Sequence, residues 1–465
     1  MNVRTPSMPP APPALASSWG NLVRTVVVFV ALVAAVGCAR TDSPTTTVSD
    51  VEEVCATDPF GCVVFNVGDP VELGALLWLG ADSSQSGVGS RVAVELAVDY
   101  LDGVFDGVPG DLLGHPVEVI IEDDGCSRED GIVAAERLRA EPRLLAVVGT
   151  TCSSAALDGA AVVFGEAGIL LVSPSATAPA LTDPDNRQRF FFRTAPNDAI
   201  QGSVLADFVV RSLTPADGDP VVVATVDDGG PYSGELAQVF GQRIELQGGV
   251  VAASPTLGAS EASPEAVAEA VAAVAAAAPD VVFLPLFEPN CSTLVTALRT
   301  VPALADTEFV VAEACVGPRF LEVAGPAGDG VFGSAPDFSD TSADPFYTQE
   351  FLPAFERRFG GRPPGVWHAH AFDAANLIFD ATRRVAIRLP GGAFAVPRSA
   401  LRSAFLDVSR YRGVSGLVTC TPSGDCAQSA RIAVYEAPLW PVEGGSAGSP
   451  TFSQSKNLAE VRNNQ

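Results

Sequence analysis

The chain alternates short apolar runs with longer amphipathic stretches from Val71 to Tyr435. The run LLAVV at residues 144–148 is one example, and its length and lack of polar residues are typical of a strand buried on both faces. Strands that alternate with helices in this way indicate a parallel sheet in an α/β fold. The predicted strands are residues 72–78, 117–122, 144–148, 169–172, 221–226, 281–286, 309–312 and 330–333.

Helices are predicted between these strands from hydrophobic periodicity and from residues that start and stop helices. Ser263 followed by Pro264 marks one start, and Pro279 lies just beyond the end of the same helix. A chain of 465 residues exceeds what one hydrophobic core usually holds, so we expect two lobes. The predicted helices are residues 87–100, 128–139, 155–166, 200–211, 233–247, 263–277, 291–300, 346–359, 366–384 and 398–406.

Polar turns follow two successive strands of this pattern. GTTCSS occupies residues 149–154 and SPSAT occupies residues 173–177, each directly after an apolar run. In a doubly wound sheet, turns at the carboxyl ends of neighbouring strands form the crevice where ligands bind. Ser153 and Ser154 also precede a helical stretch, where hydroxyl groups act as N-caps and free N–H groups can hold a carboxylate. The pattern predicts a crevice for a small anion.

The first 38 residues are predicted to be a lipoprotein signal peptide. Arg24 precedes the apolar run 26–36, which is too short to span a bilayer as a mature helix, and Gly37 and Cys38 follow it. Cys38 would become the lipidated first residue of the mature protein, although Ala35 stands where such signals usually have leucine. Ordinary signal cleavage or an uncleaved anchor would also fit this segment.

The composition argues against two classes of protein. The formal net charge of −27 argues against nucleic-acid binding, because phosphate contacts need basic patches. Lys456 is the only lysine, so the folded region lacks the lysine of a nucleotide-binding P-loop. Residues 39–69, rich in Thr, Ser, Asp and Pro, are predicted to be a flexible tether, and residues 441–465 a flexible tail.

Eight cysteines remain if Cys38 carries lipid, and export implies an oxidising compartment. Cys420 and Cys426 flank the turn TPSGD, Cys55 and Cys62 would close a small loop, and Cys291 and Cys315 begin a helix and end a strand. Spacing alone does not fix the connectivity of eight cysteines, so these pairs are hypotheses. Only three histidines and no CxxC occur, so we expect no metal site; His368 and His370 would not share a face of a helix.

Several motifs carry a family resemblance when read in order. DDGC, GTTCSS and VSPSATAPAL are followed by RFFFRTAPNDAIQGSVLADF, VVVATVDDGGPYSGELAQVF, PDVVFLPLFEP, FVVAEACVGPRFLEVAG and YRGVSGLVTCTPSGD. Together they resemble the substrate-binding proteins of branched-chain amino-acid ABC importers, which are type I periplasmic binding proteins. The resemblance extends over residues 71–435 and includes the pair Cys126–Cys152 as a disulfide beside the site.

The resemblance implies two Rossmann-like lobes with parallel sheets, joined by three crossovers that act as a hinge. We expect the crossovers near residues 194–197, 334–337 and 413–416. The first lobe would comprise residues 70–195 and 336–413, and the second lobe residues 196–335 and 414–440. The implied function is capture of an amino acid or similar small polar ligand for an ABC permease, without catalysis or a cofactor, by a lipid-anchored protein at the outer face of the cytoplasmic membrane or in the cell envelope.

The resemblance also assigns ligand-binding residues. Ser153 and Thr177 would contact the ligand's backbone through hydroxyl and main-chain groups, and Glu313 would face its ammonium. Phe287 replaces the family's tyrosine and keeps an aromatic wall. The remaining candidates are Ser154, Ser175 and Ala176 in the two polar turns, Tyr232 in the second lobe, and Trp367 near the ligand's side chain.

Simpler interpretations exist for these residues. Ser153 would be only an N-cap, Thr177 a turn residue, and Phe287 and Trp367 core aromatics. An exported hydrolase is a weaker hypothesis, because GTTCSS is not the GxSxG motif of a nucleophile elbow. The motifs would also fit a ligand-sensing receptor of the same fold, or a protein that binds urea, amides or aromatic acids in place of amino acids.

Overall fold

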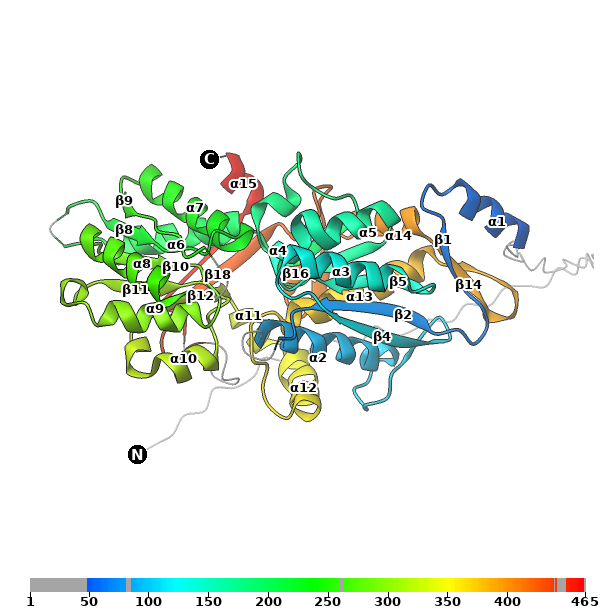
Figure 1. Ribbon diagram of the computed structural model, residues 1–465. Helices are drawn as coiled ribbons and strands as arrows, with labels where there is room; N and C mark the ends of the chain where they lie inside the picture. The colour runs from blue at the N-terminus through cyan, green and yellow to red at the C-terminus, as the bar shows by residue number, and fades with distance from the viewer. Residues whose placement is uncertain are drawn as a thin grey trace, which may run out of the picture. The chain divides into compact units, whose positions relative to one another are not determined.

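The computed structural model describes residues 48–80, 85–216, 218–258, 262–438, 440 and 449–463, with no side-chain detail for residues 48–50. These residues belong to one compact unit, Thr46–Gln465. Its main feature is a pair of seven-stranded sheets, each with helices on both faces, and each sheet is the centre of one lobe (Figure 1). The signal peptide predicted at residues 1–38, including Cys38, lies outside the described residues.

The first lobe is built on a sheet that is parallel except at one edge. Its inner strands alternate between two cores: Leu73 and Ala75 face helices α2 (Gln85–Asp99) and α13 (His368–Val385), whereas Leu76 faces α3 (Arg128–Arg139) and α5 (Ala161–Ala167). The strand order is β17 (Asp425–Ala427), β7 (Phe191–Pro196), β6 (Leu170–Ser173), β5 (Leu144–Gly149), β2 (Val71–Leu77), β4 (His115–Asp123), β3 (Asp111–Leu112).

The second lobe has five parallel strands and two antiparallel strands at one edge. Helices α6 (Asp198–Ser212) and α7 (Pro231–Leu246) cover one face, and α8 (Pro264–Ala277), α9 (Asn290–Arg299) and α10 (Pro318–Ala324) cover the other. The strand order is β19 (Phe452–Asn457), β18 (Ser429–Glu436), β12 (Phe332–Pro336), β11 (Glu308–Val311), β10 (Val281–Leu284), β8 (Val222–Thr225), β9 (Val250–Ala253).

The chain passes between the two sheets three times. It leaves the first sheet after β7, returns after β12 and α11 (Ser339–Ala343), and leaves again between β17 and β18. The third crossover is therefore at Gln428 and not at residues 413–416 as predicted. Residues 411–418 instead form a hairpin of β15 (Tyr411–Gly413) and β16 (Gly416–Val418). A three-residue strand such as β17 is too short to produce a hydrophobic pattern.

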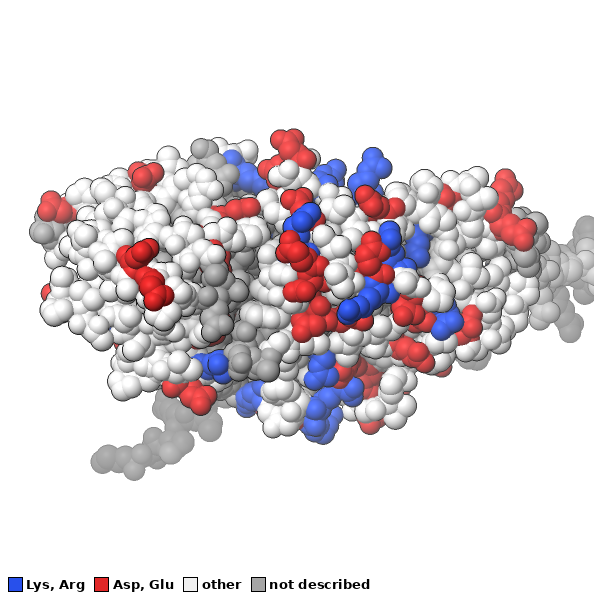
Figure 2. Space-filling view, viewed as in Figure 1, with Lys and Arg blue, Asp and Glu red and all other residues white. Residues whose placement is uncertain are grey.

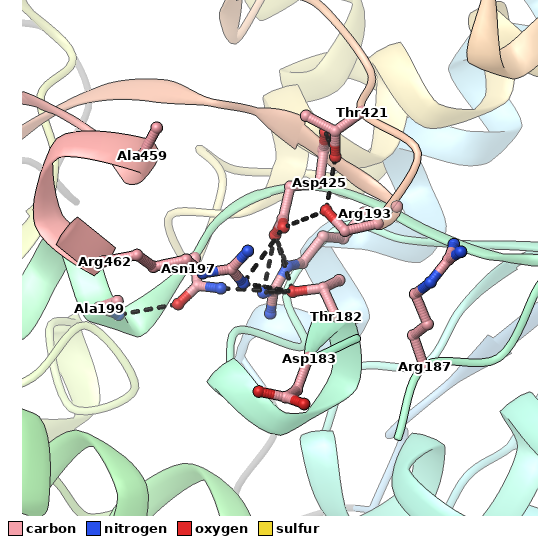
Figure 3. Close-up of polar contacts among 12 residues, drawn as sticks. Thr182, Asp183, Arg187, Arg193, Asn197, Ala199, Thr421, Asp425, Ala459 and Arg462 are labelled. Carbon is pink, nitrogen blue, oxygen red and sulfur yellow. Dashed lines mark hydrogen bonds and ion pairs between the residues drawn. The ribbon is translucent and has the colours of Figure 1, made fainter. Parts of the chain in front are cut away.

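A buried ion pair joins the two strands that precede the first and third crossovers (Figure 3). Arg193 of β7 and Asp425 of β17 approach to 2.8 Å, with side chains 0% and 2% exposed. Arg193 also donates to the carbonyls of Ala176 and Ala178, at 3.1 and 2.8 Å. Arg462 of α15 (Leu458–Asn463) lies 3.7 Å from Asp425 and so links the end of the chain to this cluster.

Two segments predicted to be flexible are ordered where the structure describes them. In the expected tether, α1 (Val48–Thr57) leads to β1 (Cys62–Phe65), which pairs with β14 (Phe394–Pro397). In the expected tail, β19 pairs with β18 along six residues and α15 follows. The sequence missed both because β1 is short and β19 is a polar edge strand, so neither has a strong hydrophobic pattern.

The remaining elements follow the sequence pattern closely. All eight predicted strands and all ten predicted helices overlap observed elements. The helix expected at residues 155–166 is interrupted, because Leu157, Asp158 and Gly159 have non-helical backbone angles. Strands β7, β9 and β18 and helix α10 are among the elements that were not predicted. Among the helices described, none has the length and apolar character that a membrane span requires.

All four cysteine pairs considered from the sequence are present. Cys126–Cys152 confirms the pair implied by the resemblance, and the other three pairs confirm the hypotheses drawn from spacing. Three disulfides lie in the first lobe and the pair Cys291–Cys315 lies in the second. The disulfides are Cys55–Cys62, Cys126–Cys152, Cys291–Cys315 and Cys420–Cys426.

Charged side chains are unevenly distributed on the face seen in Figure 2. Acidic and basic residues intermingle over α3 and its surroundings in the first lobe, whereas the second lobe shows few charges. The intermingled charges include ion pairs such as Arg137 with Glu122 at 3.2 Å. The excess of acidic residues therefore does not form a single patch on this face.

His368 and His370 lie at the start of α13, and their buried rings have different surroundings. His368 is hydrogen-bonded to the Tyr347 hydroxyl at 2.9 Å and to the Gly365 carbonyl at 3.0 Å. The ring of His370 packs edge-on against Trp367, and its Nδ1 has no partner among the described residues. Burial lowers the pKa of His370 to about 3, so this ring is neutral in the folded protein.

We expect acid to destabilise the protein partly through His370. In the unfolded chain the pKa of His370 returns to about 6.5, so protons bind the unfolded state more readily than the folded state. The free energy of unfolding is therefore highest above pH 6.5 and falls as the pH is lowered toward 3. At pH 5 the loss is about 2 kcal/mol relative to pH 8. Urea denaturation of His370→Asn should show a correspondingly smaller drop between pH 8 and pH 5. Equal drops in the variant and the parent protein would contradict this origin.

Candidate functional site

A cavity lies between the lobes, where loops from both sheets meet. The first lobe contributes the loops after β2, β5 and β6, and the second lobe contributes the loops after β10 and β11 and the start of α7. These loops follow carboxyl ends of parallel strands, as expected for ligand sites in doubly wound folds. The lining residues are Trp78, Gln85, Ser86, Thr151, Cys152, Ser153, Ser175, Tyr232, Phe287, Glu288, Glu313, Ala314, Val316, Arg319, Gly365 and Trp367.

The lobes stand close together around this cavity. The space open to the centres of water molecules is about 30 Å³, which is room for about two waters. A ligand with the size of an amino acid has more non-hydrogen atoms than this space admits. Its entry therefore requires the lobes to separate or side chains to move.

The loops of the first lobe are held by a dense set of polar contacts. Asp124 accepts hydrogen bonds from the backbone N–H groups of Cys126 at 2.9 Å and Thr151 at 2.7 Å. The disulfide Cys126–Cys152 joins the same two loops. Burial raises the pKa of Asp124 to about 7, against the opposing effect of these hydrogen bonds. The polar turn after β5 is thus fixed by a carboxyl group and a covalent bond.

Of the five candidates in the two polar turns, Ser153 and Ser175 line the cavity. The Ser153 hydroxyl accepts a hydrogen bond from the Ala178 N–H at 3.2 Å, and the Ser175 hydroxyl donates to the Thr151 carbonyl at 3.0 Å. Each hydroxyl therefore also has a structural role. Both residues are nonetheless positioned to present polar atoms to the cavity.

Ser154, Ala176 and Thr177 are not among the lining residues. The Ser154 hydroxyl donates to the Cys126 carbonyl at 2.7 Å, and Ala176 contacts Arg193 through its carbonyl. Thr177 is fully buried, and its carbonyl accepts from the Asp198 N–H at 3.1 Å. In this structure these three residues hold the turns in place.

Glu313 lines the cavity from the second lobe and is 3% exposed. The Gln201 amide donates to its carboxylate and, at 2.9 Å, to the Ser334 hydroxyl. Burial raises the pKa of Glu313, and the polar groups of Gln201 and Tyr232 only partly offset that effect. A positive charge in the cavity would favour the ionised carboxylate, because opposite charges attract strongly where water is excluded.

A second buried acid, Asp198, lies near Glu313. Both of its carboxylate oxygens lack a hydrogen-bond partner among the described residues, and the side chain is not exposed. Burial, followed by the neighbouring Glu313, raises the pKa of Asp198 well above its usual value. Asp198 does not line the cavity, and because the two buried carboxyl groups are neighbours, ionisation of one disfavours ionisation of the other.

Aromatic side chains connect the two lobes across the cavity. Phe287 packs against Tyr232 with ring centres 5.0 Å apart, and against Trp78 of the first lobe at 5.7 Å in an edge-on arrangement. Trp367 also lines the cavity. Trp78 was missed as a site residue because it is the last residue of a predicted strand. Its position at the carboxyl end of that strand was the one signal that could have identified it.

Glu288 and Arg319 were also missed as site residues. Gln85 begins α2, and its amide, oriented to satisfy its hydrogen bonds, accepts from the Arg319 N–H at 3.2 Å. Glu288 follows Phe287 directly within the motif PLFEP, which was the available signal. Within the part of the chain that is described, one group of side chains has metal-ligand spacing, namely Glu288, Cys291 and Cys315. Its two cysteines form a disulfide and do not offer thiolates.

Comparison with known proteins establishes the family. A family model described as periplasmic binding protein matches residues 70–437, which takes in both lobes. The chain therefore belongs to the periplasmic binding protein family. This is a family of binding proteins, and the match confirms the resemblance found in the motifs of the sequence.

Two curated relatives come from Pseudomonas aeruginosa. An amino acid binding protein is 30% identical over 139 residues, which are 30% of this chain and 35% of that protein. A leucine-, isoleucine-, valine-, threonine-, and alanine-binding protein is 23% identical over 295 residues, which are 63% of this chain and 73% of that protein. The matched region thus spans 35% of the length of the first relative.

Solved structures confirm the expected two-lobed fold. A leucine binding protein from Thermotoga maritima aligns with a TM-score of 0.67 at 20% identity, covering 84% of this chain and 99% of that one. A solute binding protein of an ABC transporter from R. palustris, in complex with benzoate, aligns with a TM-score of 0.64 at 18% identity, covering 84% and 96%. At these identities the likeness concerns the fold alone.

Proposed function

We propose that this protein binds a free amino acid between its lobes. The observation that carries the proposal is the buried acid Glu313 at one wall of a cavity that Ser153 and Ser175 line from the other lobe. An ammonium needs acceptors with negative charge, and a carboxylate needs hydroxyl and N–H donors. The two walls complement the two charged groups that every amino acid carries.

The wider role follows from the family. Ligand would draw the lobes together, and the closed form would be delivered to an ABC permease. A ligand shifts such an equilibrium only as far as it binds the closed form more tightly than the open form. The names of the relatives, which refer to amino acids and ABC transporters, support this role. Export of the protein and its anchoring through a lipid on Cys38 are part of the same proposal.

A screen identifies the ligand. Purified protein is tested by thermal shift against the twenty amino acids, urea, amides and benzoate. A ligand at a hundredfold excess over its Kd stabilises the protein by about 2.7 kcal/mol. At least one amino acid should raise the melting temperature. Stabilisation by benzoate or urea, with none by any amino acid, would overturn the proposal.

Glu313→Gln tests the assigned chemistry. We expect affinity for the best amino acid to fall by about 10- to 100-fold, because a charge-assisted hydrogen bond is lost. Affinity for the same ligand without its amino group should change little. Isothermal titration calorimetry measures both, and Glu269→Gln, on the exposed part of α8, is the matched control. Equal losses for the two ligands would remove Glu313 from this role.

A further inference from the structure

The cavity is lined by a second set of charged groups besides Glu313. Glu288 comes from the loop after β10 and Arg319 from α10, and both line the cavity. Their surroundings differ from those of Glu313, which contacts Gln201. The backbone N–H of Arg319 instead donates to the side-chain oxygen of Gln85 in the first lobe at 3.2 Å, and the Gln85 side-chain nitrogen donates to the Pro364 carbonyl at 3.0 Å.

Glu288 and Arg319 each have an atom without a partner. Glu288 is 5% exposed, and one of its oxygens accepts from the Ser292 hydroxyl at 2.6 Å. Its other oxygen, and Nε of Arg319, have no hydrogen-bond partner among the described residues. Burial raises the pKa of Glu288, while Arg319 is near enough to oppose that shift. Among the ion pairs of the described residues, none joins the two side chains.

This arrangement discriminates among ligand side chains. An ammonium or guanidinium would be attracted by Glu288 and repelled by Arg319, and a carboxylate would meet the reverse. An apolar side chain would leave both buried atoms unpaired, which is costly because they lose water and gain no partner. A neutral group that has a hydrogen-bond donor and an acceptor would pair with the Glu288 oxygen and with the Arg319 Nε–H.

We propose that the unpaired carboxylate oxygen of Glu288 and the unpaired Nε–H of Arg319, on one wall of the cavity, select an amino acid with a carboxamide side chain. The amide NH₂ would donate to Glu288, and the amide carbonyl would accept from Arg319. This specificity rests on the proposed function, because the ligand's ammonium and carboxylate must first be held by the other groups of the cavity. The ligand would then be glutamine or asparagine.

Calorimetric titration of the purified protein with glutamine, asparagine, leucine, glutamate and lysine tests this specificity. Glutamine or asparagine should bind at least 10-fold more tightly than leucine, glutamate and lysine. Binding of leucine as tightly as both carboxamides would overturn the specificity and leave the proposed function standing. Absence of binding by all five, with none in the wider screen, would overturn both.

Variants separate recognition from folding. Glu288→Gln and Arg319→Gln should each weaken the preferred carboxamide by 10-fold or more and leave leucine affinity unchanged or higher. Glu322→Gln, at an exposed position of α10, is the matched control and should change neither. Equal weakening of both ligands by Glu288→Gln and Arg319→Gln would show a general structural role and overturn the proposal. Circular dichroism and the melting temperature check the fold of each variant.

Discussion

Replacement of Arg193 by methionine should lower the free energy of unfolding by about 3–5 kcal/mol, because it leaves the Asp425 carboxylate buried without its partner. Besides that ion pair, Arg193 donates to Thr182 at 2.7 Å and to two carbonyls of the turn after β6. Its loss therefore also loosens that turn. Urea denaturation at pH 7 measures the effect.

Two comparisons make this prediction specific. Arg431→Met removes an exposed ion pair, 3.2 Å from Asp340, and should cost less than about 1 kcal/mol. The double variant Arg193→Met, Asp425→Leu should recover part of the loss, because no charge is then left buried. A loss after Arg193→Met as small as that after Arg431→Met would contradict the importance of the buried pair.

The same cluster has a pH dependence with a defined sign. Burial raises the pKa of Asp425, but Arg193 and Arg462 outweigh burial and hold it below its usual value. The stability that Asp425 contributes is therefore present above its unfolded pKa of about 3.9, and is lost as the pH falls through the lower folded value. The difference between the parent protein and Arg193→Met should shrink as Asp425 becomes protonated.

Gly149→Ala should cost about 3–5 kcal/mol and abolish ligand binding at the same time. Gly149 has φ +151°, and an added Cβ would lie 2.2 Å from the Leu76 carbonyl oxygen. The strain of the backbone and the clash with β2 add together. Since Gly149 begins the turn that carries Ser153, the chain can relieve the clash only by moving that turn. Urea denaturation and calorimetric titration measure the two effects.

Gly103→Ala separates the backbone strain from the clash. Gly103 has φ +91°, and nothing lies within 4 Å of the position its Cβ would occupy. This variant should lose only about 1 kcal/mol and should bind ligand normally. If both alanine variants cost the same, the close approach of Gly149 to β2 has no energetic consequence.

The fold was predictable where the hydrophobic pattern is strong. The inner strands of both sheets are apolar on both faces, so runs such as residues 144–148 identified them. The edge elements were not predicted, because they form by pairing with a neighbouring strand and have no strong hydrophobic pattern of their own. Strand β19 is a polar strand that pairs with the outer edge of β18. Strand β17 is recognised as a strand only by its pairing with β7.

The site was predictable to the extent that position along a strand implies position in space. Ser153, Ser175, Tyr232, Phe287, Glu313 and Trp367 line the cavity, and each was named from a motif. Thr177 shows the limit of that reasoning, because a motif does not say whether a side chain faces the cavity or the core. Gln85 and Arg319 come from different lobes, so only the folded structure brings them together.

The disulfides have one further consequence, which concerns the order of synthesis. Every bonded cysteine pairs with the next one along the chain, at separations of 7, 26, 24 and 6 residues. An oxidant that joins cysteines as they emerge from a translocation channel would therefore form the native pairs directly, without reshuffling. If Cys38 kept a free thiol, it would precede Cys55, and joining the two would shift every later pairing by one cysteine. The lipid thioether proposed for Cys38 would remove that thiol.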